Sequence, residues 1–283
     1  MKKMLFSAIA LVLCGGLLAS CTNATSVSSG SNSASASSQA QPVELTVFAA
    51  ASLTETFEEI AELYKTEAPN VSLQFTFDSS GTLKTQIEEG AACDVFISAA
   101  QKQMDQLDIQ ADASVNTDGL DFIDHSTRFN FLENQVVLVV PQNNPANIQS
   151  FADLTSDKLN LIALGNEDVP VGAYSTEILT HLGVLTALEE NQKITYGSNV
   201  KEVTTQVSEG SADCGIIYAT DAFRAGLTVV DKATADMCSQ VIYPAAALKN
   251  SQHPQEAQAF LTFLKTNEKA HAILQEVGFT IVE

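Results

Sequence analysis

Lysine and arginine are scarce in this chain of 283 residues. There are 14 of them against 34 aspartates and glutamates, and the net charge is −20 at pH 7. A surface this acidic repels nucleic acids and anionic bilayers, so the composition argues against both as binding partners. The four histidines are scattered, and no Cys-x-x-Cys or His-Glu-x-x-His spacing is present. We therefore expect no direct metal-ion ligands.

The sequence motifs of catalysis are missing as well. The chain contains no G-x-S-x-G, no G-x-x-x-x-G-K and no G-x-G-x-x-G, the motifs that position a nucleophile or cradle a phosphate in α/β enzymes. The sequence therefore predicts a protein that is not an enzyme and uses no cofactor. A DNA-binding regulator would carry a helix-turn-helix where this chain has an export signal and a tether.

The N-terminal segment has the composition of an export signal. Two lysines precede an apolar run from Met4 to Ser20, which predicts a lipoprotein signal peptide over residues 1–20. The segment Leu18-Ala19-Ser20-Cys21 resembles the bacterial lipoprotein box. This resemblance implies that Cys21 is lipidated and holds the protein on the extracytoplasmic face of the cell membrane. An uncleaved transmembrane anchor is the alternative, since roughly 17 apolar residues come close to spanning a bilayer.

Residues 21–42 follow the signal with almost nothing but small and polar side chains. Such a segment cannot bury a core, and we interpret it, from the lipidated cysteine onward, as a flexible Ser/Ala-rich tether.

From residue 43 onward, strand patterns and helix patterns alternate, which predicts an α/β fold. Expected strands lie at 45–49, 72–77, 94–98, 136–141, 159–164, 193–196, 214–220 and 241–248. Expected helices begin at about 52 and 200 and cover 82–90, 101–107, 173–181, 254–265 and 268–277. This order implies mostly parallel sheets with helices on their faces, and a ligand site at the carboxyl ends of the strands.

Serine residues stand at two such strand ends, each where a helix begins. Ser52 precedes Glu55 by three residues, which is the spacing of a capping box, and Ser80 starts the next helix. Free N–H groups at a helix N-terminus favour anions. Helix starts at Val171, after a proline, and at Val200, after Asn199, would face the two serines. We expect these four neutral helix starts to converge on one cleft.

A short internal repeat indicates two equivalent lobes. Residues 85–94 (TQIEEGAACD) are similar to residues 205–214 (TQVSEGSADC), and both run from a helix end through glycine into a strand. The predicted organisation is a first lobe at 43–132, a second lobe at 133–243, and a return to the first lobe at 244–283 with C-terminal helices.

Five motifs together resemble the molybdate-binding component of ABC transporters. They are Ala49–Thr54, Ser79–Leu83, Gly90–Ser98, Val169–Tyr174 and Gly215–Tyr218. The resemblance covers residues 43–283 and implies the type II periplasmic-binding-protein fold, two α/β lobes joined by two crossover strands with the ligand cleft between them. It further implies a monomeric extracytoplasmic receptor that captures molybdate, and tungstate with it, for an ABC permease. The alternative is a receptor for another tetrahedral oxyanion such as sulfate or phosphate.

The resemblance also assigns the ligand donors. They are the hydroxyls of Ser52 and Ser80, the backbone N–H groups of Val171 and Val200, and the hydroxyl of Tyr218. Molybdenum would enter only as its oxyanion, through these same residues. A core tyrosine with its hydroxyl at the surface is the alternative interpretation of Tyr218.

Neutral donors suit a dianion whose oxygens only accept hydrogen bonds. They disfavour hydrogen phosphate, whose own hydrogen would meet a donor. Asp78 would reverse this selectivity if it reached the ligand; we expect it instead to cap the turn and point to solvent. Of the remaining cysteines, Cys214 and Cys238 could form a disulfide, and Cys93 is expected to stay a buried thiol.

Overall fold

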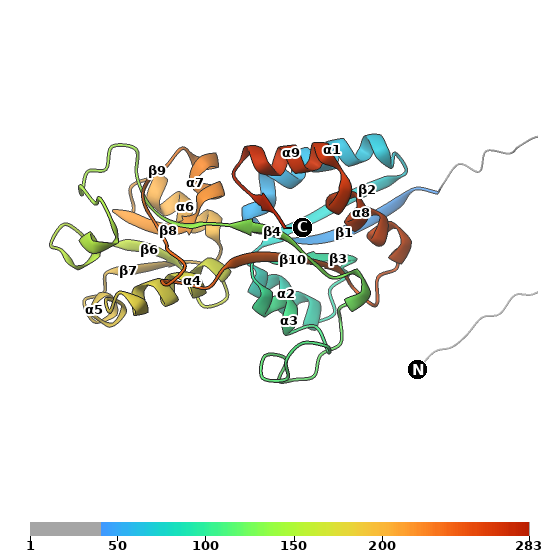
Figure 1. Ribbon diagram of the computed structural model, residues 1–283, viewed down its shortest axis with the longest axis horizontal. Helices are drawn as coiled ribbons and strands as arrows, with labels where there is room; N and C mark the ends of the chain where they lie inside the picture. Colours follow the sequence, from blue (N-terminus) through green and yellow to red (C-terminus); the bar gives the residue numbers. More distant parts are fainter. Residues whose placement is uncertain (1–40, 283) are drawn as a thin grey trace, which may run out of the picture. The chain divides into compact units, whose positions relative to one another are not determined.

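Two β-sheets, each with helices on both faces, make up residues 41–282, the part of the chain that the computed structural model describes (Figure 1). The predicted signal peptide (1–20), the lipidation site Cys21 and nearly all of the tether lie outside these residues. Within residues 41–282, no helix has the length and the hydropathy needed to cross a membrane.

The six-stranded sheet forms the first lobe, with the strand order β11-β4-β10-β3-β1-β2. Its strands are β1 (Val43–Ala50), β2 (Val71–Asp78), β3 (Val95–Ile97), β4 (Phe129–Asn134), β10 (Val241–Ala247) and β11 (Thr280–Ile281). β1 pairs in parallel with β2 and β3, whereas β10 is antiparallel to β3 and β4, and β11 is antiparallel to β4.

The five-stranded sheet forms the second lobe, with the order β7-β6-β8-β5-β9. Its strands are β5 (Val136–Val140), β6 (Ile162–Gly165), β7 (Ile194–Gly197), β8 (Cys214–Tyr218) and β9 (Thr228–Lys232). β6 is parallel to β7 and β8, and β5 is antiparallel to β8 and β9. The expectation of mostly parallel sheets holds for β2-β1-β3 and β7-β6-β8 only. Both sheets are mixed, because β10 in the first and β5 in the second, each next to a crossover, are antiparallel to both of their neighbours.

Helices cover both faces of each sheet, as Figure 1 shows. In the first lobe they are α1 (Thr54–Glu67), α2 (Ser80–Glu88), α3 (Gln101–Asp105), α8 (Pro254–Thr266) and α9 (Glu268–Glu276), with the 3-10 turns η1 (Ala51–Leu53) and η2 (His125–Thr127). In the second lobe they are α4 (Pro170–His181), α5 (Leu185–Glu190), α6 (Val200–Ser208) and α7 (Ala219–Ala225), with the 3-10 turn η3 (Phe151–Thr155). α1 and α9 lie on the face of the first sheet opposite α2 and α3.

Side-chain alternation along β1 explains why both faces need helices. Leu45, Val47 and Ala49 are buried in the large core that contains Phe57 of α1. Phe48, between them, points to the other face and joins a second core with Leu83 of α2. Successive side chains of a strand point to opposite faces, so an apolar run without alternation must be buried on both sides.

The two lobes share one topology, as the internal repeat predicts. Each sheet contains three parallel strands in equivalent order, β2-β1-β3 and β7-β6-β8, and an antiparallel strand follows, β10 in the first sheet and β5 in the second. The repeat falls at equivalent places, α2 leading to β3 and α6 leading to β8. Gly90 and Gly210 follow these helices with φ of +90° and +72°, the left-handed conformation that glycine adopts at little cost after a helix end.

Two crossovers connect the lobes. β4 continues through Gln135 into β5, and the segment after β9 returns through residues 233–240 to β10. β4 and β10 pair side by side in the first sheet. The sequence analysis predicts the crossover at Val136 and the return at Val241, but it misses β4, β9, β11, α5 and α7. It extends β8 to Thr220, although the strand ends at Tyr218 and α7 begins at once.

Candidate functional site

The carboxyl ends of six strands surround one small cavity between the lobes. β1, β2 and β3 contribute from the first lobe, and β6, β7 and β8 from the second. All five donors predicted from the sequence line this cavity. The complete lining is Ala50, Ala51, Ser52, Asp78, Ser79, Ser80, Ala99, Val169, Pro170, Val171, Val200 and Tyr218. The starts of α2, α4 and α6 therefore converge on this cavity as expected, whereas the fourth position, Ser52, lies in the 3-10 turn ahead of α1.

Ser52 does not cap a helix, contrary to the capping-box prediction. It lies in η1, and neither η1 nor α1 has a side-chain cap. Its Oγ instead lies 2.9 Å from the hydroxyl oxygen of Tyr243, a buried residue of β10. The short turn between β1 and α1 holds Ser52 at the cavity wall, where it is only 5% exposed.

Ser79 and Ser80 make different hydrogen bonds at the start of α2. Ser79 is the N-cap of α2, and its Oγ accepts the backbone N–H of Thr82 at 3.0 Å. Ser80, the first residue of the helix, is completely buried, and its Oγ accepts the N–H of Ala99 at 2.9 Å. Because a backbone N–H can only donate, the hydroxyl hydrogen of Ser80 is left available for the cavity.

Val171 and Val200 present backbone N–H groups in the first turns of α4 and α6. Such positions have no intrahelical acceptor, and neither N–H makes a hydrogen bond within residues 41–282. Pro170 opens α4, three residues earlier than the expected start. The Asn199 cap of α6 is confirmed, because its side chain accepts the N–H of Glu202 at 3.1 Å.

Tyr218 closes the cavity at the end of β8. Its hydroxyl oxygen is buried and has no well-oriented hydrogen bond in the described part of the chain. Burial, above all, raises its pKa well above the ordinary value, so the hydroxyl keeps its hydrogen and stays a donor. The alternative, a core tyrosine with its hydroxyl at the surface, is wrong. An unpartnered buried donor is costly unless an acceptor is supplied.

Asp78 lines the cavity, although it was expected to point to solvent. The capping part of that expectation is confirmed, because Oδ1 accepts the N–H of Ser79 at 2.7 Å. The same oxygen lies 3.3 Å from Nδ2 of Asn199 in the second lobe. This carboxylate therefore links the two lobes at the cavity edge.

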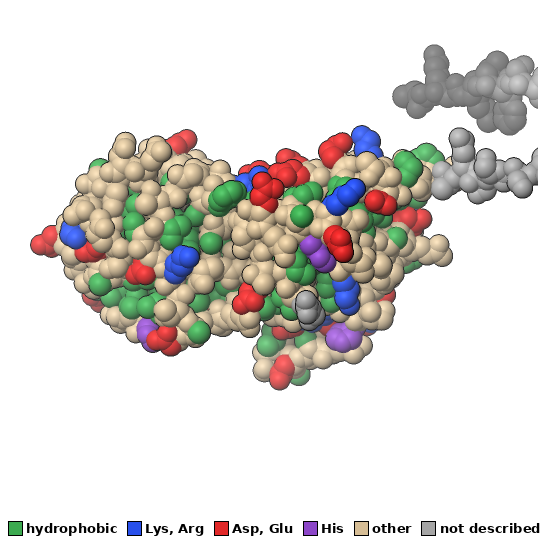
Figure 2. All heavy atoms as spheres, turned by 45° about the horizontal axis from the view of Figure 1, so that its top comes forward, with side chains coloured by type: hydrophobic (Ala, Val, Ile, Leu, Met, Phe, Trp, Pro, Cys, Tyr) green, Lys and Arg blue, Asp and Glu red, His purple; other side chains and the backbone are tan. Residues whose placement is uncertain are grey.

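No lysine, arginine or histidine is among the residues that line the cavity. Acidic side chains spread over both lobes on the face shown in Figure 2, with few basic ones between them. In the described residues, no group of three or more His, Cys, Asp or Glu side chains could hold a metal ion. The electrostatic attraction for an anion must therefore come from hydroxyls, N–H groups and helix ends.

A charged cluster beside the cavity was missed by sequence reasoning. Nζ of Lys201 in α6 lies 2.8 Å from Oε2 of Glu55 in the first lobe and 3.1 Å from Oδ1 of Asp221 in α7. Asp221 is completely buried, and neither carboxylate oxygen has a well-oriented hydrogen bond among the described residues. Arg224 pairs with Glu59 across the same interface at 2.9 Å. Each pair joins residues far apart in sequence, so no local pattern could reveal it.

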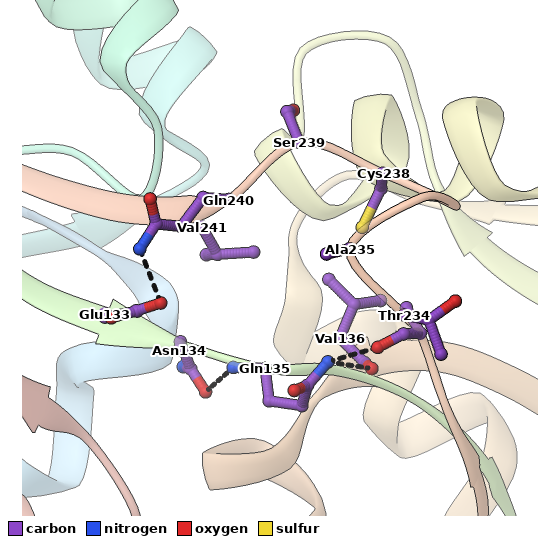
Figure 3. A pocket seen from close by; sticks show the side chains of 11 residues that line it. Glu133, Asn134, Gln135, Val136, Thr234, Ala235, Cys238, Ser239, Gln240 and Val241 are labelled. Atoms are coloured by element: carbon purple, nitrogen blue, oxygen red, sulfur yellow. Dashed lines mark hydrogen bonds between the residues drawn. The ribbon is translucent and has the colours of Figure 1, made fainter.

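A second pocket lies between the two crossover segments, lined by residues 133–136, 233–235 and 238–241 (Figure 3). Its wall includes the half-buried thiol of Cys238. The disulfide that Cys214 and Cys238 could have formed is absent, because both thiols are free. Cys93 is a buried thiol, as expected.

Comparison with known proteins places these features in a family. The family described as bacterial extracellular solute-binding protein matches residues 45–280. The molybdate-binding protein ModA of Mycobacterium tuberculosis is 35% identical over 270 residues, 93% of this chain and 96% of that protein. ModA of Escherichia coli is 36% identical over 250 residues, 84% and 89% of the two chains.

Among solved structures, the periplasmic molybdate-binding protein of Azotobacter vinelandii is similar, with a TM-score of 0.73 at 25% identity. The match covers 84% of this chain and all of that one. The predicted type II periplasmic-binding-protein fold is confirmed.

Proposed function

Because this chain belongs to the family of bacterial extracellular solute-binding proteins, we propose that it captures molybdate outside the cytoplasm and delivers it to an ABC permease. The observation that carries the proposal is the buried hydroxyl of Tyr218, which has no well-oriented hydrogen bond in the described residues and faces a cavity with four other donors. Solute-binding proteins are transport receptors, so we propose no catalytic step.

The donors match the chemistry of molybdate. Its oxygens only accept hydrogen bonds, and Ser52, Ser80 and Tyr218 would donate hydroxyl hydrogens while Val171 and Val200 donate N–H groups. Helix ends add partial positive charge without a buried cation. Tungstate has the same shape and charge, so this set of donors would hold it as well.

The remaining parts of the chain complete the proposal. Cys21 would carry the lipid that anchors a monomer to the extracytoplasmic face of the membrane, after removal of residues 1–20. The lobe boundaries proposed are 43–132, 133–243 and 244–283. The change of sheet at Gln135 and within residues 233–240 supports this division and shifts its two boundaries by a few residues, because Glu133, Asn134 and Val241–Tyr243 pair in the first sheet. Closure of the lobes on the ligand would create the form that the permease recognises.

The test is calorimetric titration of the fragment Ala40–Glu283, which forms a compact unit by itself, with molybdate, tungstate, sulfate and phosphate. We expect binding of molybdate and tungstate only, weakened roughly 10- to 100-fold by Ser80→Ala, because a hydrogen bond to a charged group is lost. Thr127→Ala is the matched control, since Thr127 Oγ1 also accepts a backbone N–H, that of Ala247, but lies away from the cavity.

A preference for phosphate or for sulfate would assign a different function. Preference for phosphate would mean that Asp78 accepts the hydrogen of a protonated oxyanion. Preference for sulfate would make the protein a sulfate receptor. No binding of any of the four would overturn the proposal.

A further inference from the structure

A chain of hydrogen-bonded side chains leads from the cavity to both crossovers. Ser52 Oγ lies 2.9 Å from Tyr243 Oη, and Asn134 Nδ2 lies 3.3 Å from the same Oη and 2.9 Å from Thr220 Oγ1. All four side chains are buried, and Tyr243 is 0% exposed. Asn134 ends β4, where the chain leaves the first lobe, and Tyr243 lies in β10, where it returns.

The direction of these hydrogen bonds follows from the Asn134 end. Its Oδ1 accepts the backbone N–H of Gln135 at 2.8 Å, as the dashed line in Figure 3 marks. Since an N–H can only donate, the amide oxygen must lie on that side and the amide nitrogen on the side of Tyr243. Tyr243 Oη is therefore the acceptor of its bond with Asn134.

The hydrogen of the Tyr243 hydroxyl must then point elsewhere. Ser52 Oγ is its one remaining well-oriented hydrogen-bond partner among residues 41–282, because the Tyr218 hydroxyl makes no such bond. A completely buried O–H without an acceptor is costly, so Tyr243 donates to Ser52. Burial raises the pKa of Tyr243, which keeps it a donor throughout the ordinary pH range. Ser52 Oγ accepts this bond, and its own hydrogen is free to point into the cavity.

We propose that Tyr243 is a positioning and specificity-determining residue, which acts through Ser52 by fixing the Ser52 hydroxyl as a hydrogen-bond donor to the oxyanion. This inference rests on the proposed function. Tyr243 itself is not among the residues that line the cavity. The Ser80 hydroxyl is also fixed as a donor, because its oxygen accepts the N–H of Ala99, a backbone group that can only donate. The Ser52 hydroxyl is fixed by the Tyr243 hydroxyl, which could donate or accept, and Asn134 determines that it donates.

Loss of the Tyr243 hydroxyl would free Ser52 to rotate. Its oxygen could then present a lone pair to the cavity, which does not help molybdate but suits the hydrogen of a protonated oxyanion. For Tyr243→Phe we therefore expect molybdate affinity to fall about 10-fold and the preference for molybdate over phosphate to narrow by at least the same factor.

A double-mutant cycle on the Ala40–Glu283 fragment tests the coupling. Molybdate and phosphate are titrated into wild type, Tyr243→Phe, Ser52→Ala and the double variant. Because Tyr243 acts through Ser52, we expect Tyr243→Phe to have less than about a twofold further effect once Ser52 is alanine. Tyr174→Phe is the matched control. Tyr174 is a buried tyrosine of α4, with its ring centroid 6.5 Å from that of Tyr218, and it makes no hydrogen bond to Ser52.

A second variant keeps Tyr243 and removes the side-chain amide of Asn134, which makes the Tyr243 hydroxyl donate to Ser52. Asn134→Leu leaves Tyr243 free to accept from Ser52, and it should lower molybdate affinity in the same direction. Thermal unfolding of every variant without ligand shows which ones fold, so Asn134→Leu carries the test if Tyr243→Phe does not fold.

The outcomes separate the two proposals. Unchanged affinity in Tyr243→Phe, or an equal loss in the wild-type and Ser52→Ala backgrounds, would overturn the role of Tyr243 while molybdate binding by wild type stands. A wild-type fragment that binds no molybdate would overturn the proposed function and this inference with it.

Discussion

Gly81 in the first lobe donates its backbone N–H to the carbonyl oxygen of Asp168 in the second lobe, with 3.0 Å between the two atoms. A Cβ added to Gly81 would lie 2.3 Å from that same oxygen and 2.9 Å from the Cα of Asp168. This explains why glycine follows the serine pair at the start of α2. The backbones of the two lobes touch there, next to the cavity, and no side chain fits between them.

Gly81→Ala should therefore lower the affinity for molybdate without lowering the thermal stability of the ligand-free protein. The φ of Gly81 is not in the left-handed region, and alanine is the better helix former, so the lobe itself should tolerate the change. Approach of the lobes would meet backbone atoms that cannot move aside, at a cost of roughly 1–3 kcal/mol. We expect molybdate affinity to fall about 10- to 100-fold with unchanged thermal stability of the ligand-free fragment. Wild-type affinity in the calorimeter would contradict this.

Lys201→Met should weaken both the fold and the closure of the lobes. The change removes the cation shared by Glu55 and the buried Asp221. Because the Lys201 and Glu55 side chains are 29% and 44% exposed, we expect a loss of roughly 2 kcal/mol in unfolding free energy rather than the larger loss of a fully buried pair. Molybdate affinity should fall too, since Glu55 lies in the other lobe.

The control for this change is Lys65→Met. Nζ of Lys65 lies 3.9 Å from Oε2 of Glu62, and both side chains are mostly exposed. Urea denaturation should show a change below about 0.5 kcal/mol for this exposed pair. Equal losses in the two variants would contradict a special role of Lys201.

Asp221 should give the protein an unusual pH dependence. Burial raises its pKa from 3.8 to about 6, although Lys201 opposes the shift. Between pH 3.8 and about pH 6, Asp221 is more protonated in the folded protein than in the unfolded chain. Its contribution to the free energy of unfolding therefore falls as the pH rises through this range. Relative to Asp221→Asn, wild type should gain about 1 kcal/mol between pH 7 and pH 5. Denaturation of both proteins at pH 5, 6 and 7 measures this, and a difference independent of pH would contradict it.

Thiol labelling should find three free cysteines in the Ala40–Glu283 fragment. Burial raises the pKa of Cys238 to about 11 and that of Cys93 and Cys214 further still. Because the thiolate is the reactive form, native Cys238 should react roughly 100-fold more slowly at pH 8 than an ordinary thiol, and the other two should not react. After denaturation in urea without reductant, all three should react. A single reactive thiol would reveal a disulfide.

The sequence predicts site residues best where their positions depend on a local pattern. The ends of six strands and the starts of their helices are local features, so the sequence alone predicts Ser80, Val171 and Val200 at one cleft, and all three line the cavity. The reason given for Ser52 was wrong, although its position was right. A capping box is a local pattern, whereas its actual partner Tyr243 lies 191 residues further along the chain.

Long-range pairing explains the other misses. Lys201 and Glu55 are 146 residues apart, and either one alone resembles an ordinary charged residue on a helix surface. The prediction that Asp78 points to solvent is wrong for the same reason. The turn that Asp78 caps is local, but Asn199, whose side chain contacts it at the cavity edge, belongs to the other lobe. β4 (FNFLEN) and β9 (TVVDK) mix apolar with polar residues, so their sequences carry a weaker strand signal than the continuous apolar run of β5.

A cavity lined without lysine, arginine or histidine leaves an arriving dianion facing the field of an acidic protein. Long-range electrostatics then oppose the encounter, while short-range donors hold the anion once it has arrived. Dissolved salt screens the repulsion beyond about 10 Å at 0.1 M but hardly affects buried hydrogen bonds. Higher ionic strength should therefore speed capture and leave the residence time unchanged, the reverse of a receptor that draws its anion in with positive charge.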